Sequence, residues 1–178
     1  FFFFFKDVER KKTTMLALGF DFRNYLKIHR QIILATRFTA NTSVGSARIV
    51  YFLGGVDNWL TPRFNNDIEV AQDKNYVYQA LATNMRGFTQ NIRNGTTFAV
   101  INNEIRIPLF AYLSNRPLRS DFLKNFMIVP FADIGTAWSG PNPYSNDNTF
   151  NKRVITRYPL TITVINIREP IVGGVGGG

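Results

Sequence analysis

The sequence of 178 residues contains no cysteine and only one histidine, His29. These absences exclude disulfide bonds, thiolate chemistry and any metal site built from several histidines. Long apolar runs are also missing. The longest are Phe1–Phe5 and short stretches such as 15–20 and 31–35, whereas a membrane-spanning helix needs about 20 apolar residues in a row. The sequence therefore predicts no transmembrane helix and no metal centre.

The first residues carry little information about the fold. Five phenylalanines, Phe1–Phe5, are an unusual natural start, and the charged segment 6–12 stands where a signal peptide would have its small-residue cleavage site. We expect the chain to begin after any targeting signal. Residues 1–11 are assigned to an N-terminal segment of uncertain role, and Phe1–Phe5 support no conclusion about the fold.

The charge of the chain is strongly positive but dispersed. Twenty-one Lys and Arg against 12 Asp and Glu give a formal net charge of +9, yet the only short cluster of cations is at 9–12. A nucleic-acid-binding domain would gather its cations on one helix or face and would carry a recognisable motif. The sequence has neither, so we predict no nucleic-acid partner.

Enzymatic motifs are lacking as well. The sequence has no nucleophile elbow and no phosphate-binding loop, and the glycines of 173–178 have the wrong spacing for a dinucleotide site and no helix after them. His29 lies in a short polar segment and is expected to be a turn residue rather than a catalytic base. We predict that the chain is not an enzyme and that it holds no cofactor.

What the sequence does contain is strand after strand. Apolar and polar residues alternate with a period of two, so that in 12–23 Leu16, Leu18 and Phe20 share one face while Asp21 and Arg23 share the other. Helical spacing never persists through a useful window. The other candidate strands are 31–43, 47–54, 97–109 and 126–138, and a last one begins near Ile171. The predicted fold class is all-β and antiparallel.

Two environments could accept such two-faced strands. One is a soluble sandwich or lipocalin-like barrel with the apolar face inward. The other is a transmembrane barrel, favoured because the strands reach the 9–11 residues needed to cross a bilayer and because the polar face mixes charges with small residues. A short turn at 43–46 also contrasts with long connections at 55–96 and 139–170, as in outer-membrane barrels.

The transmembrane interpretation assigns the apolar phase of each strand to lipid. Trp59 and Trp138 lie at strand ends beside the long connections, where an aromatic girdle is expected. The residues predicted to face lipid are Leu16, Leu18, Phe20, Ile32, Leu34, Phe38, Ile105, Ile107 and Ile134.

Three short motifs occur in order along the chain. They are Arg86-Gly87-Phe88 in the long connection, Glu104 four residues before Pro108, and Phe131-x-Asp133-x-Gly135. In this order they resemble the Omp85 superfamily of outer-membrane assembly and translocation barrels, of the BamA and TamA kind. The resemblance covers about 12–178 and is closest to the Bacteroidetes branch. In that family the loop motif folds back into the barrel lumen, and the glutamate and the aspartate belong to the next two strands.

The resemblance implies both a fold and a function. The full barrel would have sixteen strands, and about six strands in 12–178 are fewer than the eight that a closed membrane barrel requires, so we expect part of a longer chain. The implied location is the bacterial outer membrane, and the implied activity is protein insertion or translocation there. The implied partners are outer-membrane lipid and lipopolysaccharide, client proteins, an upstream periplasmic domain and accessory subunits.

Physical chemistry agrees with the carried-over motif. Glu104 and Asp133 fall on the polar phase of their strands, where two neighbouring carboxylates repel unless a cation lies between them. The planar fork of Arg86 can bond both carboxylates and keeps its charge when buried. Gly87 would allow a sharp turn of the backbone, and Phe88 would pack where water is excluded.

Two other functions remain open at the level of sequence. A passive outer-membrane channel or ligand transporter would share the alternating strands but would not need Arg86 docked between two carboxylates. A soluble β-barrel binding protein would instead bury the apolar phase, including Leu16, Phe38, Ile105 and Ile134, in an internal core.

Overall fold

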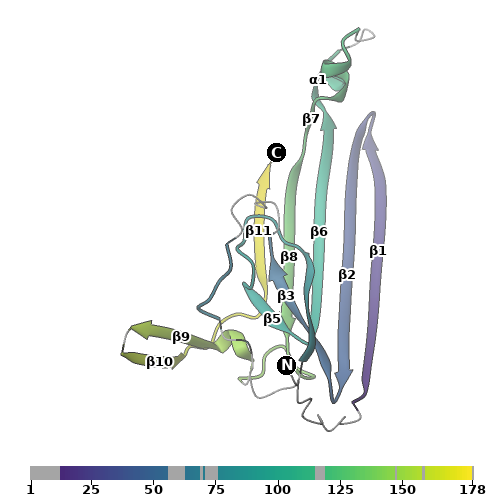
Figure 1. Ribbon diagram of the computed structural model, residues 1–178. Coiled ribbons are helices and arrows are strands. Elements are labelled where there is room, and N and C mark those ends of the chain that lie inside the picture. The colour runs from purple at the N-terminus through teal and green to yellow at the C-terminus, as the bar shows by residue number, and fades with distance from the viewer. Residues whose placement is uncertain are drawn as a thin grey trace, which may run out of the picture.

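The computed structural model describes residues 13–55, 63–68, 70, 76–114, 119–146, 148–157 and 159–177. It has one large antiparallel sheet with a smaller three-stranded unit packed on one face (Figure 1). The large sheet has the order β1-β2-β6-β8-β11. These strands span Met15–His29 (β1), Ile32–Gly45 (β2), Thr97–Pro108 (β6), Pro130–Trp138 (β8) and Val172–Gly177 (β11). The predicted all-β class is therefore confirmed.

The register of the sheet sorts side chains into two faces. Phe20 pairs with Ala40, which pairs with Ala99, and Asp21 pairs with Thr39, which pairs with Val100. We call the face that carries Phe20 the outer face and the face that carries Asp21 the inner face. Because successive side chains in a strand point to opposite sides, each whole strand follows this division.

The outer face is apolar and open. Leu18 is 59% exposed, Phe20 is 55% exposed and Ile134 is 50% exposed. Leu16 and Ile105 are exposed on the same face, while Ile32, Leu34, Phe38 and Ile107 are partly covered by neighbouring side chains. A soluble barrel would bury this face. Within the described residues, no other element packs over it.

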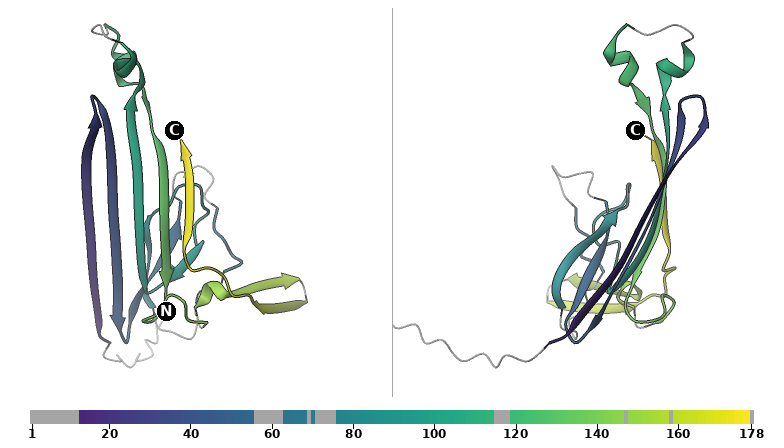
Figure 2. Two further views of the ribbon diagram at one scale, coloured as in Figure 1. Left: turned by 180° about the vertical axis from the view of Figure 1, so that it is seen from behind. Right: turned by 90° about the vertical axis from the view of Figure 1, so that its right-hand side faces the viewer.

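The inner face carries the smaller unit. It consists of β3 (Arg48–Gly54), β4 (Tyr76–Asn84) and β5 (Arg93–Gly95), in which β3 pairs parallel with β4 and antiparallel with β5. Figure 2 shows this unit leaning against one side of the large sheet near one end. We call 48–95, which contains the unit, the tongue.

The hydrophobic core lies between the tongue and the large sheet. Its buried members are Tyr51, Leu53 and Met85 from the tongue and Phe98, Val100 and Ala137 from the inner face. The rings of Tyr51 and Phe98 pack edge to face, with centroids 5.0 Å apart. Burying each large apolar side chain contributes about 1.5–3 kcal/mol, so this cluster holds the tongue in place.

The two ends of the large sheet differ in their connections. At the turn end, β1 and β2 meet at Arg30 and Gln31. A longer connection there contains α1 (Leu109–Leu113) and α2 (Asp121–Asn125), and it is followed by β7 (Met127–Ile128), which pairs antiparallel with the end of β6. At the loop end lie the tongue and a connection with η1 (Thr149–Asn151), β9 (Lys152–Arg157) and β10 (Leu160–Ile165). Among the described residues, no helix is long and apolar enough to cross a membrane.

The structure corrects part of the predicted strand order. Residues 47–54 were expected to follow the turn at 43–46 as another strand of the large sheet. Instead, β3 turns onto the inner face, and β2 pairs directly with β6. The turn at 43–46 is therefore the start of the long connection rather than a short link between wall strands. The sequence holds the reason, because the run Ile49–Leu53 is continuously apolar, which suits a strand covered on both faces.

Two further expectations differ from the structure. The connections at 55–96 and 139–170 contain strands, namely β4, β5, β9 and β10, and they are not irregular throughout. His29 is the last residue of β1 rather than a turn residue, and its ring packs against Tyr112 of α1. Within the described residues β1 and β11 form the two edges of the large sheet.

Candidate functional site

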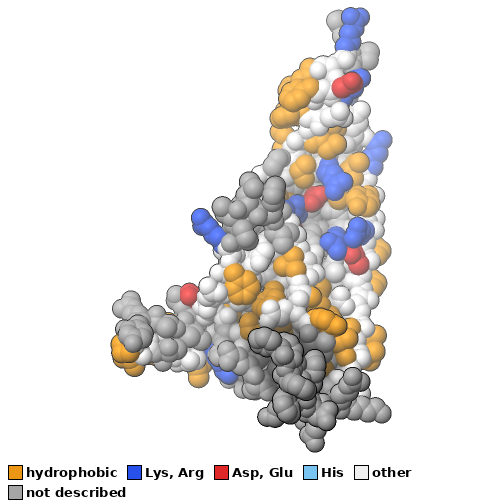
Figure 3. All heavy atoms as spheres, viewed as in Figure 1, with side chains coloured by type: hydrophobic (Ala, Val, Ile, Leu, Met, Phe, Trp, Pro, Cys, Tyr) orange, Lys and Arg blue, Asp and Glu red, His pale blue; other side chains and the backbone are white. Residues whose placement is uncertain are grey.

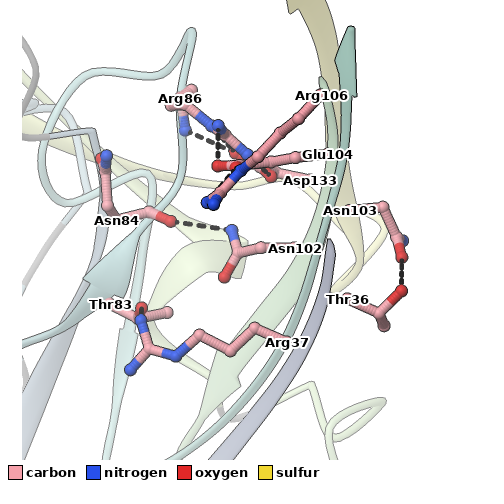
Figure 4. Close-up of polar contacts among 10 residues, drawn as sticks. All are labelled: Thr36, Arg37, Thr83, Asn84, Arg86, Asn102, Asn103, Glu104, Arg106 and Asp133. Atoms are coloured by element: carbon pink, nitrogen blue, oxygen red, sulfur yellow. Dashed lines mark hydrogen bonds and ion pairs between the residues drawn. The ribbon is translucent and has the colours of Figure 1, made fainter. Parts of the chain in front are cut away.

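Arg86 lies at the tip of the tongue, between two carboxylates of the inner face (Figure 4). Its Nε and backbone N–H donate to Asp133 Oδ2 at 2.9 and 3.0 Å, and its Nη2 donates to Asp133 Oδ1 at 2.7 Å. Nη1 donates to Glu104 Oε1 at 2.5 Å. The guanidinium therefore bridges β6 and β8 with its whole donor edge.

The register of the sheet sets the two carboxylates beside each other. Asp133 pairs with Asn102, and Glu104, two residues farther along β6, pairs with Phe131. Asp133 and Glu104 thus sit on one face, in adjacent rows of adjacent strands, where their like charges require a cation. Charge-assisted, bidentate bonds of the kind that Arg86 makes are the strongest hydrogen bonds in proteins.

The aromatic ring of Phe131 completes the cage around Arg86. The guanidinium carbon lies 4.0 Å from the centroid of the Phe131 ring. A cation over a ring face is attracted by the negative face of the quadrupole, and the contact also excludes water from one side of the ion pairs. Phe131, Glu104 and Asp133 therefore contact Arg86 together.

The backbone of the tongue tip fits the wall closely. Gly87 adopts a positive φ of 83°, a conformation that L residues with a Cβ avoid, so the chain can turn back after Arg86. Met85 is fully buried, and its amide donates to the carbonyl of Gly54 at 2.9 Å. The turn therefore places Met85 and Phe88 against the sheet.

Two glycines of the large sheet, which have no side chain, leave the space that the tip of the tongue occupies. A Cβ at Gly135 would lie 2.9 Å from Met85 Sδ, and a Cβ at Gly174 would lie 2.9 Å from Phe88 Cε2 and 3.1 Å from the carbonyl oxygen of Arg86. All three distances are shorter than ordinary contacts of a carbon atom. Gly135 and Gly174 thus form the floor on which the tip rests.

The ion pairs of Arg86 with Asp133 and Glu104 are largely buried, so removing one partner alone is costly. The side chain of Asp133 is 0% exposed, that of Arg86 17% and that of Glu104 24%. Hydrogen bonds to Asp133, and more weakly to Glu104, raise the pKa of Arg86, so the guanidinium stays charged at every physiological pH. Removing one partner of a buried pair costs about 3–5 kcal/mol, because the other charge is left uncompensated.

A second polar layer joins the tongue to the sheet nearer the loop end. Asn102 Nδ2 donates to the carbonyl of Asn84 at 3.0 Å, and Arg37 Nη1 donates to the Thr83 hydroxyl at 3.2 Å. Arg37 also pairs with Asp21, Nη2 to Oδ2 at 2.6 Å. The tongue is therefore fixed by polar contacts to three strands of the wall, β2, β6 and β8.

Arg93, which no pattern in the sequence singles out, is a buried arginine, 6% exposed. Its side chain donates to the carbonyls of Pro170 at 3.3 Å and Glu169 at 2.6 Å, and its guanidinium carbon lies 5.1 Å from the centroid of the Phe150 ring. Burial lowers the pKa of Arg93 to about 10, with the charge of Arg168 as a smaller cause. Arg93 thus joins the tongue to the connection 139–171.

A group of asparagines surrounds Arg93 and extends this contact. Asn94 Oδ1 accepts from the Thr149 hydroxyl at 2.6 Å, and Asn94 Nδ2 donates to Asn91 Oδ1 at 2.7 Å. Asn91, which has a positive φ of 62°, donates in turn to the carbonyls of Asn65 and Ile68. The buried side chains form a polar block at the loop end.

The remaining predicted site residues lie apart from the Arg86 cage. Trp138 ends β8 at the loop end on the outer face, since it pairs with Thr97. Trp59 falls outside the described residues. Pro108 ends β6, where it pairs with Met127 at the turn end. Among the described residues, no group of three or more His, Cys, Asp or Glu side chains is arranged to hold a metal ion.

No protein-family model, curated protein or solved structure matches this chain.

Proposed function

We propose that this chain is part of a transmembrane β-barrel of the Omp85 type, which inserts or translocates proteins at the bacterial outer membrane. The observation that carries the proposal is the bridge from Arg86 to both Glu104 and Asp133, made by three motifs that stand in the family's order. In this view the inner face lines the barrel lumen, and the tongue is the loop that folds into it.

The outer face supports the membrane location. Its exposed leucines, phenylalanines and isoleucines, among them Leu18, Phe20 and Ile134, would be unfavourable in water as one continuous surface. Strands β1, β2 and β6 have 15, 14 and 12 residues, enough for tilted strands to cross a bilayer. Lipid contacts the outer face in this proposal, and further strands of a longer chain pair with the edges of β1 and β11.

In this proposal the docked tongue makes the barrel rigid at the strands that it contacts. Strands β6, β8 and β11 each contact the tongue tip, through Glu104, Asp133 and Gly174. A lumen loop held in this way fixes the geometry of those strands while other parts of the barrel remain able to open. We propose that this rigid side supports the client strand during insertion, without any catalytic residue or cofactor.

The experiment is client folding in liposomes that contain the full-length protein. We expect the wild type to accelerate the insertion of a urea-denatured outer-membrane barrel, and we expect Arg86→Ala to lose most of that acceleration. Lys124→Ala is the matched control, because Lys124 is 50% exposed and bonds Asp121 on α2, outside the contacts of the tongue.

A passive channel is the main competing function, and the same vesicles distinguish it. A channel would release entrapped small solutes without accelerating client insertion. That result, with the wild-type protein folded in the membrane, would replace the proposed function.

A further inference from the structure

A polar cleft of about 270 Å³ lies on the inner face, beside the docked tongue. Four arginines and one glutamate line it, namely Arg23, Arg37, Arg86, Arg106 and Glu104, and Tyr25 lies among them. Figure 3, viewed from the side of the tongue, shows cationic and anionic side chains gathered on the sheet alongside it. The lining therefore has an excess of positive charge.

The carboxylates near the cleft are already bonded. Asp21 accepts from both Arg23 and Arg37, and Glu104 accepts from both Arg86 and Arg106. No carboxylate oxygen of these two residues is without an arginine donor. A cation would find little to bind here, whereas an anion would meet guanidinium groups.

Two of the arginines have donors to spare. Arg23 and Arg106 each use Nε and Nη2 on one carboxylate, and the Nη1 group of each makes no hydrogen bond to the part of the chain that the structure describes. Their side chains are 56% and 43% exposed, in contrast to 17% for Arg86. The spare donors are thus open to a ligand, while Arg86 is committed to the tongue.

Tyr25 lies beside both of these arginines. It shares the inner face of β1 with Arg23, two residues away, and the Arg106 guanidinium carbon lies 5.7 Å from the centroid of its ring. Residues two apart in a strand are about 6.6 Å apart, so Tyr25 adjoins Arg23 along β1. The ring offers apolar surface to a ligand that contacts both arginines.

We propose that the cleft binds an acidic polypeptide segment, with carboxylates on Arg23 and Arg106 and the chain between them against Tyr25. Anion binding follows from the cleft itself, whereas the choice of a polypeptide as the source rests on the proposed function. Guanidinium groups bind carboxylates and phosphates by the same fork geometry, so free phosphate is the competing source.

The test measures binding of a fluorescent peptide of alternating glutamate and serine to the full-length protein in detergent, by polarisation. The probe should bind, more weakly as salt is raised, and the same peptide with glutamine in place of glutamate should not. The double variant Arg23→Gln/Arg106→Gln should bind at least about tenfold more weakly, the loss expected for hydrogen bonds to charged groups. It retains Arg37 on Asp21 and Arg86 on Glu104, so it should fold.

The matched control is Arg48→Gln/Lys124→Gln, which removes two positive charges from outside the cleft. Arg48 bonds the carbonyl of Gly45, and Lys124 bonds Asp121 on α2. Equal weakening in the control and the test variant would overturn the proposal, because binding would then follow net charge alone. Displacement of the peptide by inorganic phosphate at a similar concentration would overturn the polypeptide class.

The outcome is separable from that of the proposed function. If the wild type accelerates client insertion but does not bind the glutamate peptide, only the cleft proposal is overturned. If it binds the peptide through Arg23 and Arg106 but does not accelerate insertion, the anion site is supported and the proposed function is overturned.

Discussion

Arg86 donates three hydrogen bonds to the single carboxylate of Asp133, one of them from its own backbone N–H. The side chain therefore holds the charge while the main chain holds the position of the tongue tip. Because Asp133 is fully buried, any variant that removes the positive charge at position 86 leaves an uncompensated carboxylate in the large sheet.

Arg86→Ala should destabilise the folded protein by about 3 kcal/mol, near the lower end of the range for one-sided loss of a buried pair, because Glu104 is partly exposed. Arg86→Lys should recover only part of this, since an ammonium group cannot form the fork. The measurement is the temperature at which the full-length protein loses its compact migration in a detergent gel. A melting temperature that changes as little as that of Arg23→Ala would contradict the role of Arg86.

Gly174→Val should displace the tongue tip without removing any charge. Its Cβ would meet Phe88 and the carbonyl oxygen of Arg86, whereas at Gly173, on the outer face, the nearest atom would be Ile134 Cγ1 at 3.5 Å. We expect faster hydrogen exchange at 85–88 in Gly174→Val and none of this effect in Gly173→Val. Similar exchange in the two variants would show that the close contact does not hold the tip.

Gly87→Ala tests the turn of the tongue tip separately from its packing. No atom lies within 4 Å of a Cβ at this position, so the cost comes only from the positive φ. That cost is about 1–2 kcal/mol. Hydrogen exchange at 85–88 should be faster in this variant than in the wild type, and an equal rate would contradict the predicted strain.

Arg93→Met should uncouple the tongue from the connection 139–171. The variant loses the hydrogen bonds to the carbonyls of Glu169 and Pro170, so both oxygens, that of the buried Pro170 included, lose a donor. We expect limited proteolysis near 159–171 to accelerate several-fold. Arg63→Met, at an exposed position, is the control, and cleavage at the same rate in both variants would remove the assigned role of Arg93.

Phe20→Arg tests the environment of the outer face. A cation near the middle of a lipid-facing strand costs about 2–4 kcal/mol in an outer-membrane barrel, so the variant should integrate poorly into membranes. Tyr144→Arg, at an exposed aromatic in the loop-end connection, should integrate normally. Normal integration of Phe20→Arg would favour a soluble location for the outer face.

The alternation of residue types determined much of this fold. In β1, β2, β6 and β8 the period of two fixes both the strand and the face of each side chain, because a strand can only send successive side chains to opposite sides. The same reasoning places Glu104 and Asp133 on one face, where their charges require a cation. The choice of Arg86 as that cation came from the resemblance of the three motifs, because alternation alone does not say which loop residue reaches the two carboxylates.

The sequence pattern by itself could not decide which strands pair. Residues 47–54 were predicted to form a strand of the wall, and they do form a strand, but its partners lie in the tongue. The carbonyl partners of Arg93 lie more than 70 residues away, and backbone acceptors leave no trace in residue type. Local periodicity therefore specified strands and faces, while long-range packing of the tongue against the inner face decided the topology, the polar block and the cleft.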